Sequence, residues 1–469
     1  KFRQVVALMR PALMVAWAVM AASCSEPATR DPGKLVELMG DSSIPDDVRM
    51  AADRKLAGLE GEGYLPRIEA LERVLQQRGA STSMQIHAMD GLEEADSSRL
   101  VVALKIFLSR AREEALARAC DLAVRAGDEG LLPALTRSLA RGEAEGDEER
   151  ELRQRPEWHA IEKLFGKPVR EALWEMLHDS SGRVAALAVL ARVETEGGLV
   201  KELDAMGATE DKWLDSVRWW AGAFGTVPYG EYETDAVVSL HLPENEGLMA
   251  RALAKYRTIA EGGDSWMAPR FVEVLAEVDD AGMGMSRAAL LADLRQRLSG
   301  IGHMRREPSS PGAMDDNPET LAFNEKRLSR GDLLMVRMLL RLLPGKIAEF
   351  GREADADRAD VTTEHGGLLK VEQGELIIVP RAPAMAESDV VYETSGRTIR
   401  EAATGVALYH FHAQRVDNSE RAGPSLGDMI FSKETRVNCV VITSVGKGQL
   451  DFDYYTPAGA VIDLGVYRY

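Results

Sequence analysis

The chain has 469 residues, of which 45% are apolar and 28% charged, and its formal net charge is −18. This composition is that of a globular protein, long enough for two to four domains of about 150 residues each. The acidic balance excludes general electrostatic binding of nucleic acid, because contacts to phosphates need clustered lysine and arginine side chains. The sequence contains no long basic run.

Residues 1–24 have the pattern of an export signal. A basic head precedes an uninterrupted apolar run from 12 to 22, which has the length of a signal-peptide core. The run is shorter than the roughly 20 residues needed to span a bilayer. Small residues then precede Cys24, which resembles a bacterial lipoprotein signal whose cysteine carries a lipid anchor. Cleavage after Ser23 by an ordinary signal peptidase is the alternative, and both readings predict export. With the lipid anchor, the protein is expected in the bacterial cell envelope, on the periplasmic face of the membrane. A short buried or interfacial helix is the reading without export.

Two further cysteines, Cys120 and Cys439, lie in a helical and a strand-like stretch of different regions. Cysteine is among the residue types most often buried as a free thiol. We therefore expect two buried free thiols rather than a disulfide. No pair has the spacing of a cysteine zinc site.

Residues 31–305 are expected to form an all-α domain, because apolar residues recur there at three- and four-residue spacing. Several alanine- and leucine-rich segments resemble one another, and the first three are separated by about 30 to 37 residues, the range of helix-pair repeats. They begin at Asp46, Ser83, Glu114 and Ser181. The pattern resembles HEAT-like repeats, which stack into a solenoid and can bind a protein partner. An irregular helical domain without a true repeat is the alternative.

Residues 306–330 are rich in proline, serine, glycine and aspartate at their start and are expected to form a linker. The remaining segment, 331–469, begins with an apolar helix and continues as short β-branched and aromatic runs with turn residues between them. The chain is therefore expected to be multidomain, with a strand-rich domain at its C-terminus. The expected strands are 366–371, 374–380, 389–394, 406–412, 438–443, 450–456 and 459–467.

The segment "YHFH" within the fourth of these strands is the candidate for chemistry. Side chains alternate between the two faces of a strand, so His410 and His412 share one face and Phe411 takes the other. Two imidazoles on one face can coordinate one metal ion, but a metal site needs a third protein ligand. Asp428 is one candidate and Asp417, closer in sequence, is the other.

The order of these residues resembles the JAMM (MPN+) zinc metallopeptidase family, whose pattern is an upstream glutamate, then H-x-H, then S-x-x-D. Glu364 stands before the glycine-rich start of the first strand, His410 and His412 form the H-x-H, and "SLGD" supplies Ser425 and Asp428. The resemblance covers roughly residues 335 to 469. It differs from the family in Phe411, where serine or threonine is commoner, and in a longer loop before Ser425.

The resemblance implies an α/β domain of the MPN type, similar to cytidine deaminases, and a Zn²⁺ ion held by His410, His412 and Asp428. It implies that Glu364 acts as the general acid and base and that Ser425 stabilises the oxyanion. The implied reaction is hydrolysis of a peptide or isopeptide bond in a peptide or protein substrate. A catalytic zinc with three protein ligands keeps one position for water, which agrees with this assignment.

Less specific explanations exist for the same residues. Serine followed three positions later by aspartate is also a helix N-terminal capping pattern. Domains of this fold that have lost the metal act as scaffolds, and the chain can also be a helical-repeat interaction lipoprotein without catalysis. A cupin-like metal barrel is disfavoured, because no histidine follows His412.

Overall fold

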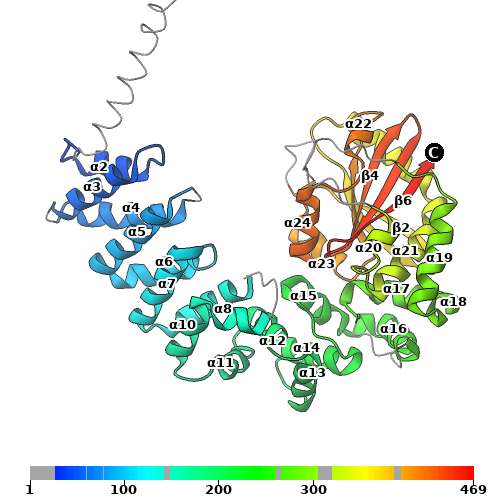
Figure 1. Ribbon diagram of the computed structural model, residues 1–469, viewed down its shortest axis with the longest axis horizontal. Helices are drawn as coiled ribbons and strands as arrows, with labels where there is room; N and C mark the ends of the chain where they lie inside the picture. The colour runs from blue at the N-terminus through cyan, green and yellow to red at the C-terminus, as the bar shows by residue number, and fades with distance from the viewer. Residues whose placement is uncertain are drawn as a thin grey trace, which may run out of the picture. The chain divides into compact units, whose positions relative to one another are not determined.

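The computed structural model describes residues 27–59, 61–77, 79–141, 148–259, 266–304, 319–384 and 392–469. The chain divides into two compact units, Lys1–Val193 and Glu194–Tyr469 (Figure 1). The predicted signal segment 1–24, including Cys24, lies outside the described residues. Within the described ranges, no helix has the length and apolar character needed to cross a membrane.

The described part of the first unit consists of helices. They are α2 (Pro32–Gly40), α3 (Asp46–Ala57), α4 (Tyr64–Gln76), α5 (Thr82–Ala95), α6 (Ser97–Phe107), α7 (Glu113–Ala126), α8 (Leu132–Arg141), α9 (Glu148–Arg153), α10 (Pro156–Phe165), α11 (Val169–Met176) and α12 (Arg183–Val193). Three of them are joined by a polar cluster: Asp53 of α3 accepts from Arg67 of α4 at 2.8 Å and lies 3.0 Å from His87 of α5. Cys120 is a buried free thiol, as predicted.

The second unit contains further helices that precede, follow and interrupt a sheet. They are α13 (Glu196–Ala205), α14 (Lys212–Phe224), α15 (Gly230–Leu240), α16 (Glu246–Ile259), α17 (Val272–Glu277), α18 (Asp280–Gly284), α19 (Arg287–Ser299), α20 (Leu321–Asn324), α21 (Arg330–Leu342), α22 (Ile347–Ala359), α23 (Gly396–Ala402) and α24 (Leu426–Thr435). The prediction of a helix-rich region followed by an α/β domain is therefore confirmed at this level. Cys439, in this unit, is also a buried free thiol.

The sheet has six strands in the order β2-β1-β3-β4-β5-β6. They are β1 (Gly366–Glu372), β2 (Glu375–Pro380), β3 (Ala407–His412), β4 (Cys439–Gly446), β5 (Gln449–Tyr455) and β6 (Val461–Arg468). Only β3 and β4 run parallel among these neighbours; the other pairs are antiparallel. The register sets His410 beside Val441 and Val441 beside Asp453, so these three side chains share one face of the sheet.

The two faces of the sheet are buried in different ways. One face packs on α21 and α22, where the ring of Phe350 lies 5.7 Å from that of Tyr409 and 5.3 Å from that of Phe452. The opposite face is covered by α23 and α24, with Ile399 and the partly buried Phe431 in the same apolar cluster as the strand residues. The second face is the one that carries His410 and His412, so α23 and α24 decide how much of it is open to solvent.

The domain boundaries differ from those expected. The compact units divide after Val193, whereas the sequence predicted one helical domain over 31–305 and a separate domain over 331–469. The physical reason is a shared core: Trp220 of α14 and Leu290 of α19 belong to the same buried apolar cluster as the sheet residue Phe452. Helices that bury the apolar face of a sheet share its core and therefore belong to the same compact unit.

The predicted linker 306–330 also differs in its second half, while its first half, 306–318, lies outside the described residues. Residues from 319 onward pack on the edge of the sheet, and Asn324 is fully buried. The side chain of Asn324 donates to the carbonyl of Val461 at 2.7 Å and accepts from its N–H at 3.3 Å. One amide side chain therefore satisfies both backbone groups of a residue on β6.

We expect Asn324→Ala to lower the free energy of unfolding of the second unit by about 1–3 kcal/mol, because both backbone groups of Val461 lose their buried partner. Urea denaturation of the full chain, followed by tryptophan fluorescence, measures this loss. Lys326→Ala, two residues away and exposed, is the matched control and should change stability by less than about 0.5 kcal/mol. Equal stability of the two variants would contradict this role for Asn324.

Candidate metal centre

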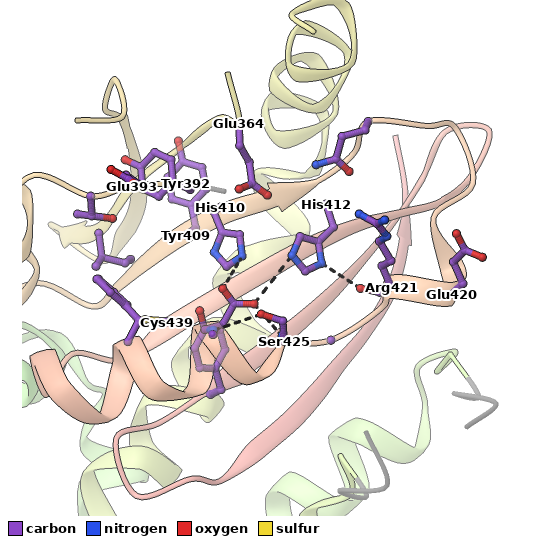
Figure 2. A pocket seen from close by; sticks show the side chains of 18 residues that line it. Glu364, Tyr392, Glu393, Tyr409, His410, His412, Glu420, Arg421, Ser425 and Cys439 are labelled. Atoms are coloured by element: carbon purple, nitrogen blue, oxygen red, sulfur yellow. Dashed lines mark hydrogen bonds and ion pairs between the residues drawn. The ribbon is translucent and has the colours of Figure 1, made fainter. Parts of the chain in front are cut away.

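A pocket of about 710 Å³ opens on the face of the sheet that α23 and α24 cover. Its wall is formed by the segment before β1, strand β3, the loops before α23 and after β3, the start of α24, and Cys439 of β4 and Tyr455 of β5 (Figure 2). Glu364, His410, His412, Ser425 and Asp428 all line it. The five residues to which the resemblance assigns roles are thus brought to one site.

Strand β3 supplies the two histidines. His410 and His412 project into the pocket with their ring centroids 5.1 Å apart, while Phe411 between them is fully buried in the core on the other face. His410 is 8% exposed. The alternation expected from the sequence is therefore present, and Phe411 is explained by packing against Phe350 rather than by chemistry.

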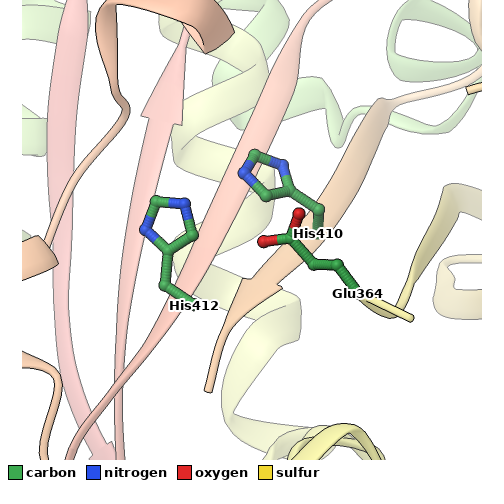
Figure 3. A group of neighbouring side chains, drawn as sticks. All are labelled: Glu364, His410 and His412. Atoms are coloured by element: carbon green, nitrogen blue, oxygen red, sulfur yellow. The ribbon is translucent and has the colours of Figure 1, made fainter. Parts of the chain in front are cut away.

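Glu364 is fixed by its neighbour in the chain, His365. The N–H of His365 donates to Asp357 of α22 at 2.6 Å, and its carbonyl accepts from the N–H of Phe411 at 3.1 Å. The bond to Phe411 extends the β1–β3 pairing, and the bond to Asp357 ties the same residue to α22. The Glu364 carboxylate lies toward the imidazoles (Figure 3). Glu364, His410 and His412 each offer a ligand atom within 4.8 Å of the others.

Gly366 leaves room for the ring of Tyr392 beside the pocket. A Cβ atom at Gly366 would lie 2.5 Å from the carbonyl oxygen of Tyr409 and 2.9 Å from the ring of Tyr392. Only glycine therefore allows Tyr392 to lie over the start of β1. Tyr392 also lines the pocket, next to Glu364.

Asp428 approaches the histidines from the first turn of α24. Ser425 caps this helix: its Oγ accepts from the N–H of Asp428 at 3.2 Å, and Asp428 accepts from the N–H of Ser425 at 2.7 Å. Asp428 Oδ1 lies 3.4 Å from His410 Nε2, and Oδ2 lies 4.0 Å from His412 Nε2. The carboxylate of Asp428 therefore both caps the helix and approaches the two histidines.

The orientation of His412 leaves a lone pair that faces the carboxylate of Asp428. The Nδ1 atom of His412 lies 2.9 Å from the carbonyl oxygen of Arg421, which can only accept, so Nδ1 is the protonated nitrogen. Nε2 of the neutral ring then carries a lone pair, and the nearest carboxylate oxygen of Asp428 is 4.0 Å away. Two acceptors face each other across a gap that a cation would fill.

Burial and mutual charge shift the pKa values of the four groups in opposite directions. Burial, followed by the charge of His410, lowers the pKa of His412 to about 4, so this ring is neutral at pH 7. Burial alone would also lower the pKa of His410, but the charge of Asp428 outweighs it and raises that pKa to about 9. Burial opposes ionisation of Asp428, yet His410 and His412 hold its pKa well below the usual range.

Glu364 is the group whose pKa lies closest to neutrality. Burial is the main cause, and it raises the pKa of Glu364 to about 7 against the opposing charge of His410. The side chain is 2% exposed, and its Oε1 has no hydrogen-bond partner among the described residues. A buried carboxylate oxygen without a partner is costly unless a ligand, water or ion completes it.

The residues present fit a zinc ion. Two imidazole nitrogens and carboxylate oxygens are the usual donors of a catalytic zinc site. In a tetrahedral site with bonds of about 2.0–2.1 Å, neighbouring donor atoms are about 3.3–3.4 Å apart, and the closest contact between Asp428 and His410 is 3.4 Å. Buried His410 Nε2 and Glu364 Oε1 lack hydrogen-bond partners in the described part of the chain.

Asp417, the rival third ligand, lies elsewhere. It is exposed and forms an isolated β-bridge with Val445, its carboxylate accepts from the N–H of Ser419 at 3.1 Å, and it is not among the residues that line the pocket. The carboxylates that reach the histidines are those of Glu364 and Asp428.

Three features of the site were not predicted from the sequence. They are the support of His365 by Asp357, the ring of Tyr392 and the carbonyl of Arg421. Asp357 lies on a helix and Tyr392 in a loop, and their separation from β3 along the sequence does not indicate that they lie near it in space. The third is a backbone group, which leaves no signal in residue type.

Comparison of the chain with protein families, curated proteins and solved structures finds no match in any of the three.

We expect the chelator-treated full chain to bind one equivalent of Zn²⁺ and to be stabilised by it, by about 2.7 kcal/mol when free zinc is 100 times its dissociation constant. His412→Ala removes one nitrogen donor and should weaken zinc binding by more than about 100-fold, since loss of mere supporting residues costs 10- to 100-fold. Isothermal titration and thermal unfolding with and without zinc measure both effects.

His178→Ala is the matched control, because His178 is an exposed histidine of the first unit. It should bind zinc as the unaltered chain does. The metal centre would be contradicted if zinc raised the melting temperature of the His412 variant as much as that of the unaltered chain.

Proposed function

We propose that the second unit is a zinc-dependent metallopeptidase that hydrolyses an amide bond in a peptide or protein. The observation that carries this proposal is the convergence of a buried histidine, a partly buried histidine and two carboxylates at one pocket, with one carboxylate on each side of the imidazole pair. A structural zinc site is closed by four protein ligands, whereas a site in a pocket of about 710 Å³ leaves room for a substrate.

Three residues would hold the zinc ion: His410, His412 and Asp428. Asp428 suits this role because it stays ionised and contacts both imidazoles. The carbonyl of Arg421 orients His412 so that Nε2 faces the centre. When bound, zinc supplies a Lewis acid and a water molecule whose pKa is lowered toward 7.

Glu364 would accept and return the proton. A general base works best when its pKa is near the working pH, and burial raises the pKa of Glu364 to about 7. The bonds made by His365 to Asp357 and Phe411 fix the backbone next to Glu364, so the carboxylate is held at the pocket rather than left mobile.

Ser425 would hydrogen-bond to the substrate oxygen that gains charge. Its Oγ accepts from the N–H of Asp428, which leaves its hydroxyl hydrogen directed away from the helix and available to a ligand. Ser425 is exposed and lines the pocket. Such a contact contributes typically 10²- to 10³-fold to the rate of acyl transfer.

The wider assignment follows the same resemblance. We propose that the second unit is an MPN-type domain, supported by the order Glu364, His410, His412, Ser425 and Asp428 along the chain and by their convergence in space. The helices of the first unit would be HEAT-like repeats that bind the substrate or a partner protein. Lipidation of Cys24 would tether the protein to a membrane of the bacterial envelope.

A metal-free scaffold is the competing function, and the close contact between Asp428 and His410 favours it. An ion pair at 3.4 Å can hold this part of the site together without a metal. A purified chain that neither contains nor takes up zinc would support the scaffold, and stoichiometric zinc would support the hydrolase.

We expect Glu364→Gln to retain one equivalent of zinc and to lose at least about 10²-fold in the rate of peptide hydrolysis, because glutamine cannot carry the proton. A library of fluorescence-quenched peptides gives the rate, and metal analysis of the same preparation gives the zinc content. Glu372→Gln, exposed at the far end of β1, is the matched control and should keep both.

Two outcomes would contradict these roles. A Glu364 variant that cleaves peptides at the original rate would remove Glu364 from the reaction. A variant that has lost its zinc would make Glu364 a ligand, and Asp428→Asn should then keep zinc.

A further inference from the structure

A second group of potential ligands lies on β5 and β6, at the edge of the sheet opposite to β1 and β2. Asp451, Asp453 and Asp463 are 1%, 0% and 8% exposed, and each offers a carboxylate oxygen within 4.8 Å of the others. Three carboxylates this close and this buried are not a solvated acidic surface. Aspartate is almost never fully buried unless it is paired.

The register of β5 and β6 places the three aspartates side by side. Asp453 lies directly opposite Asp463 in the antiparallel β5–β6 pair, and Asp451 lies two residues earlier on β5, on the same face. A bulge next to Asp453 brings Asp463 into this position, since Phe452 is paired with Gly465. Like charges directly opposite each other destabilise a sheet, and burial strengthens the repulsion.

A separate observation points to a missing partner. Asp451 Oδ1 is buried and has no hydrogen-bond partner among the described residues. The hydroxyl of Thr443, fully buried on β4 and opposite Asp451 in the register, is also without a partner in the described ranges. Two buried oxygens on neighbouring strands therefore lack the hydrogen bonds that nearly all such groups make.

In the described part of the chain, one basic side chain contacts Asp463. His303 Nδ1 lies 3.1 Å from Asp463 Oδ2, and the N–H of Gly465 donates to Asp463 Oδ1 at 2.6 Å. Glu319 adds a further negative charge near Asp451. A protonated His303 offsets one negative charge, and each oxygen of Asp463 keeps a second lone pair for a ligand.

We propose that Asp451, Asp453 and Asp463 bind one structural divalent cation of the Ca²⁺ type. Ca²⁺ takes only oxygen ligands, and the donors in this cluster are three carboxylates and one hydroxyl. Zinc, by contrast, prefers nitrogen and sulfur donors. The hydroxyl of Thr443 is positioned beside the carboxylates as a further oxygen.

This cation is separate from the proposed zinc. The two groups of ligands share one face of the sheet, but β4 lies between β3 and β5, so they are two strand spacings or about 9–10 Å apart. Metals that act together in one reaction are about 3.5–4 Å apart. The second cation would instead fix β5, β6 and the segment beside them, where Val466 donates to Gly302.

Calcium binding by the full, chelator-treated chain tests this proposal and does not depend on hydrolysis. CaCl₂ titrated calorimetrically at pH 7 should bind with one equivalent and raise the melting temperature, and Tb³⁺ should show luminescence sensitised by the nearby Tyr467. Asp451→Asn should weaken Ca²⁺ binding at least about tenfold. His412→Ala should leave it unchanged, and Asp280→Asn, at an exposed position of the same unit, is the control.

The proposal is overturned if the unaltered chain shows no Ca²⁺ binding up to about 5 mM, above the range of weak extracellular sites. It is also overturned if Asp451→Asn binds Ca²⁺ as tightly as the unaltered chain. Either result would mean that protons rather than a metal neutralise the three carboxylates. Because the titration of the unaltered chain decides by itself, a variant that fails to fold does not weaken the test.

Discussion

The structure of the second unit depends on one constraint, the alternation of side chains along β3. Tyr409 and Phe411 pack into the core formed with α22, and this packing leaves His410 and His412 no choice but the opposite face. A shift of one residue in the pairing of β3 would exchange the two sets, burying imidazoles among aromatic rings. The packing of Tyr409 and Phe411 therefore fixes which face of the sheet carries the histidines.

The same constraint extends across the sheet. Because β3, β4 and β5 are in fixed register, the face that carries the histidines also carries Thr443 and Asp451. Polar groups occupy this face at one end, and an apolar cluster with Leu408 and Tyr455 occupies it at the other, under α23 and α24. A sheet that buries polar groups in its interior must satisfy them, and metal ions satisfy several carboxylates and imidazoles at once.

The sequence was informative where the signal is local. Alternating apolar runs predicted all six strands, and the capping pattern of Ser425 and Asp428 predicted the start of α24. The expected strand over 389–394 is not supported in its described part, because residues 392–394 have no regular structure and Tyr392 instead folds over Gly366. Tyr392 and Thr394 have high strand propensity, but both line the pocket instead.

What the sequence could not predict depends on long-range packing. The boundary after Val193 arises because α14 to α19 share a core with the sheet, and no change in composition marks it. The acidic cluster of β5 and β6 was also missed, because it depends on a bulge that brings Asp463 opposite Asp453. The convergence of Glu364 with the histidines was inferred only from a resemblance in residue order, since nothing local relates residues 46 positions apart.

The central claim is that His410 and His412 bind one zinc ion together with a carboxylate. A crystal of the zinc-loaded chain, with diffraction recorded on either side of the zinc absorption edge, tests it most directly. The account predicts one strong anomalous peak within about 2.0–2.1 Å of an imidazole nitrogen of each histidine. No peak between these two rings, or a peak coordinated by other residues, would contradict it.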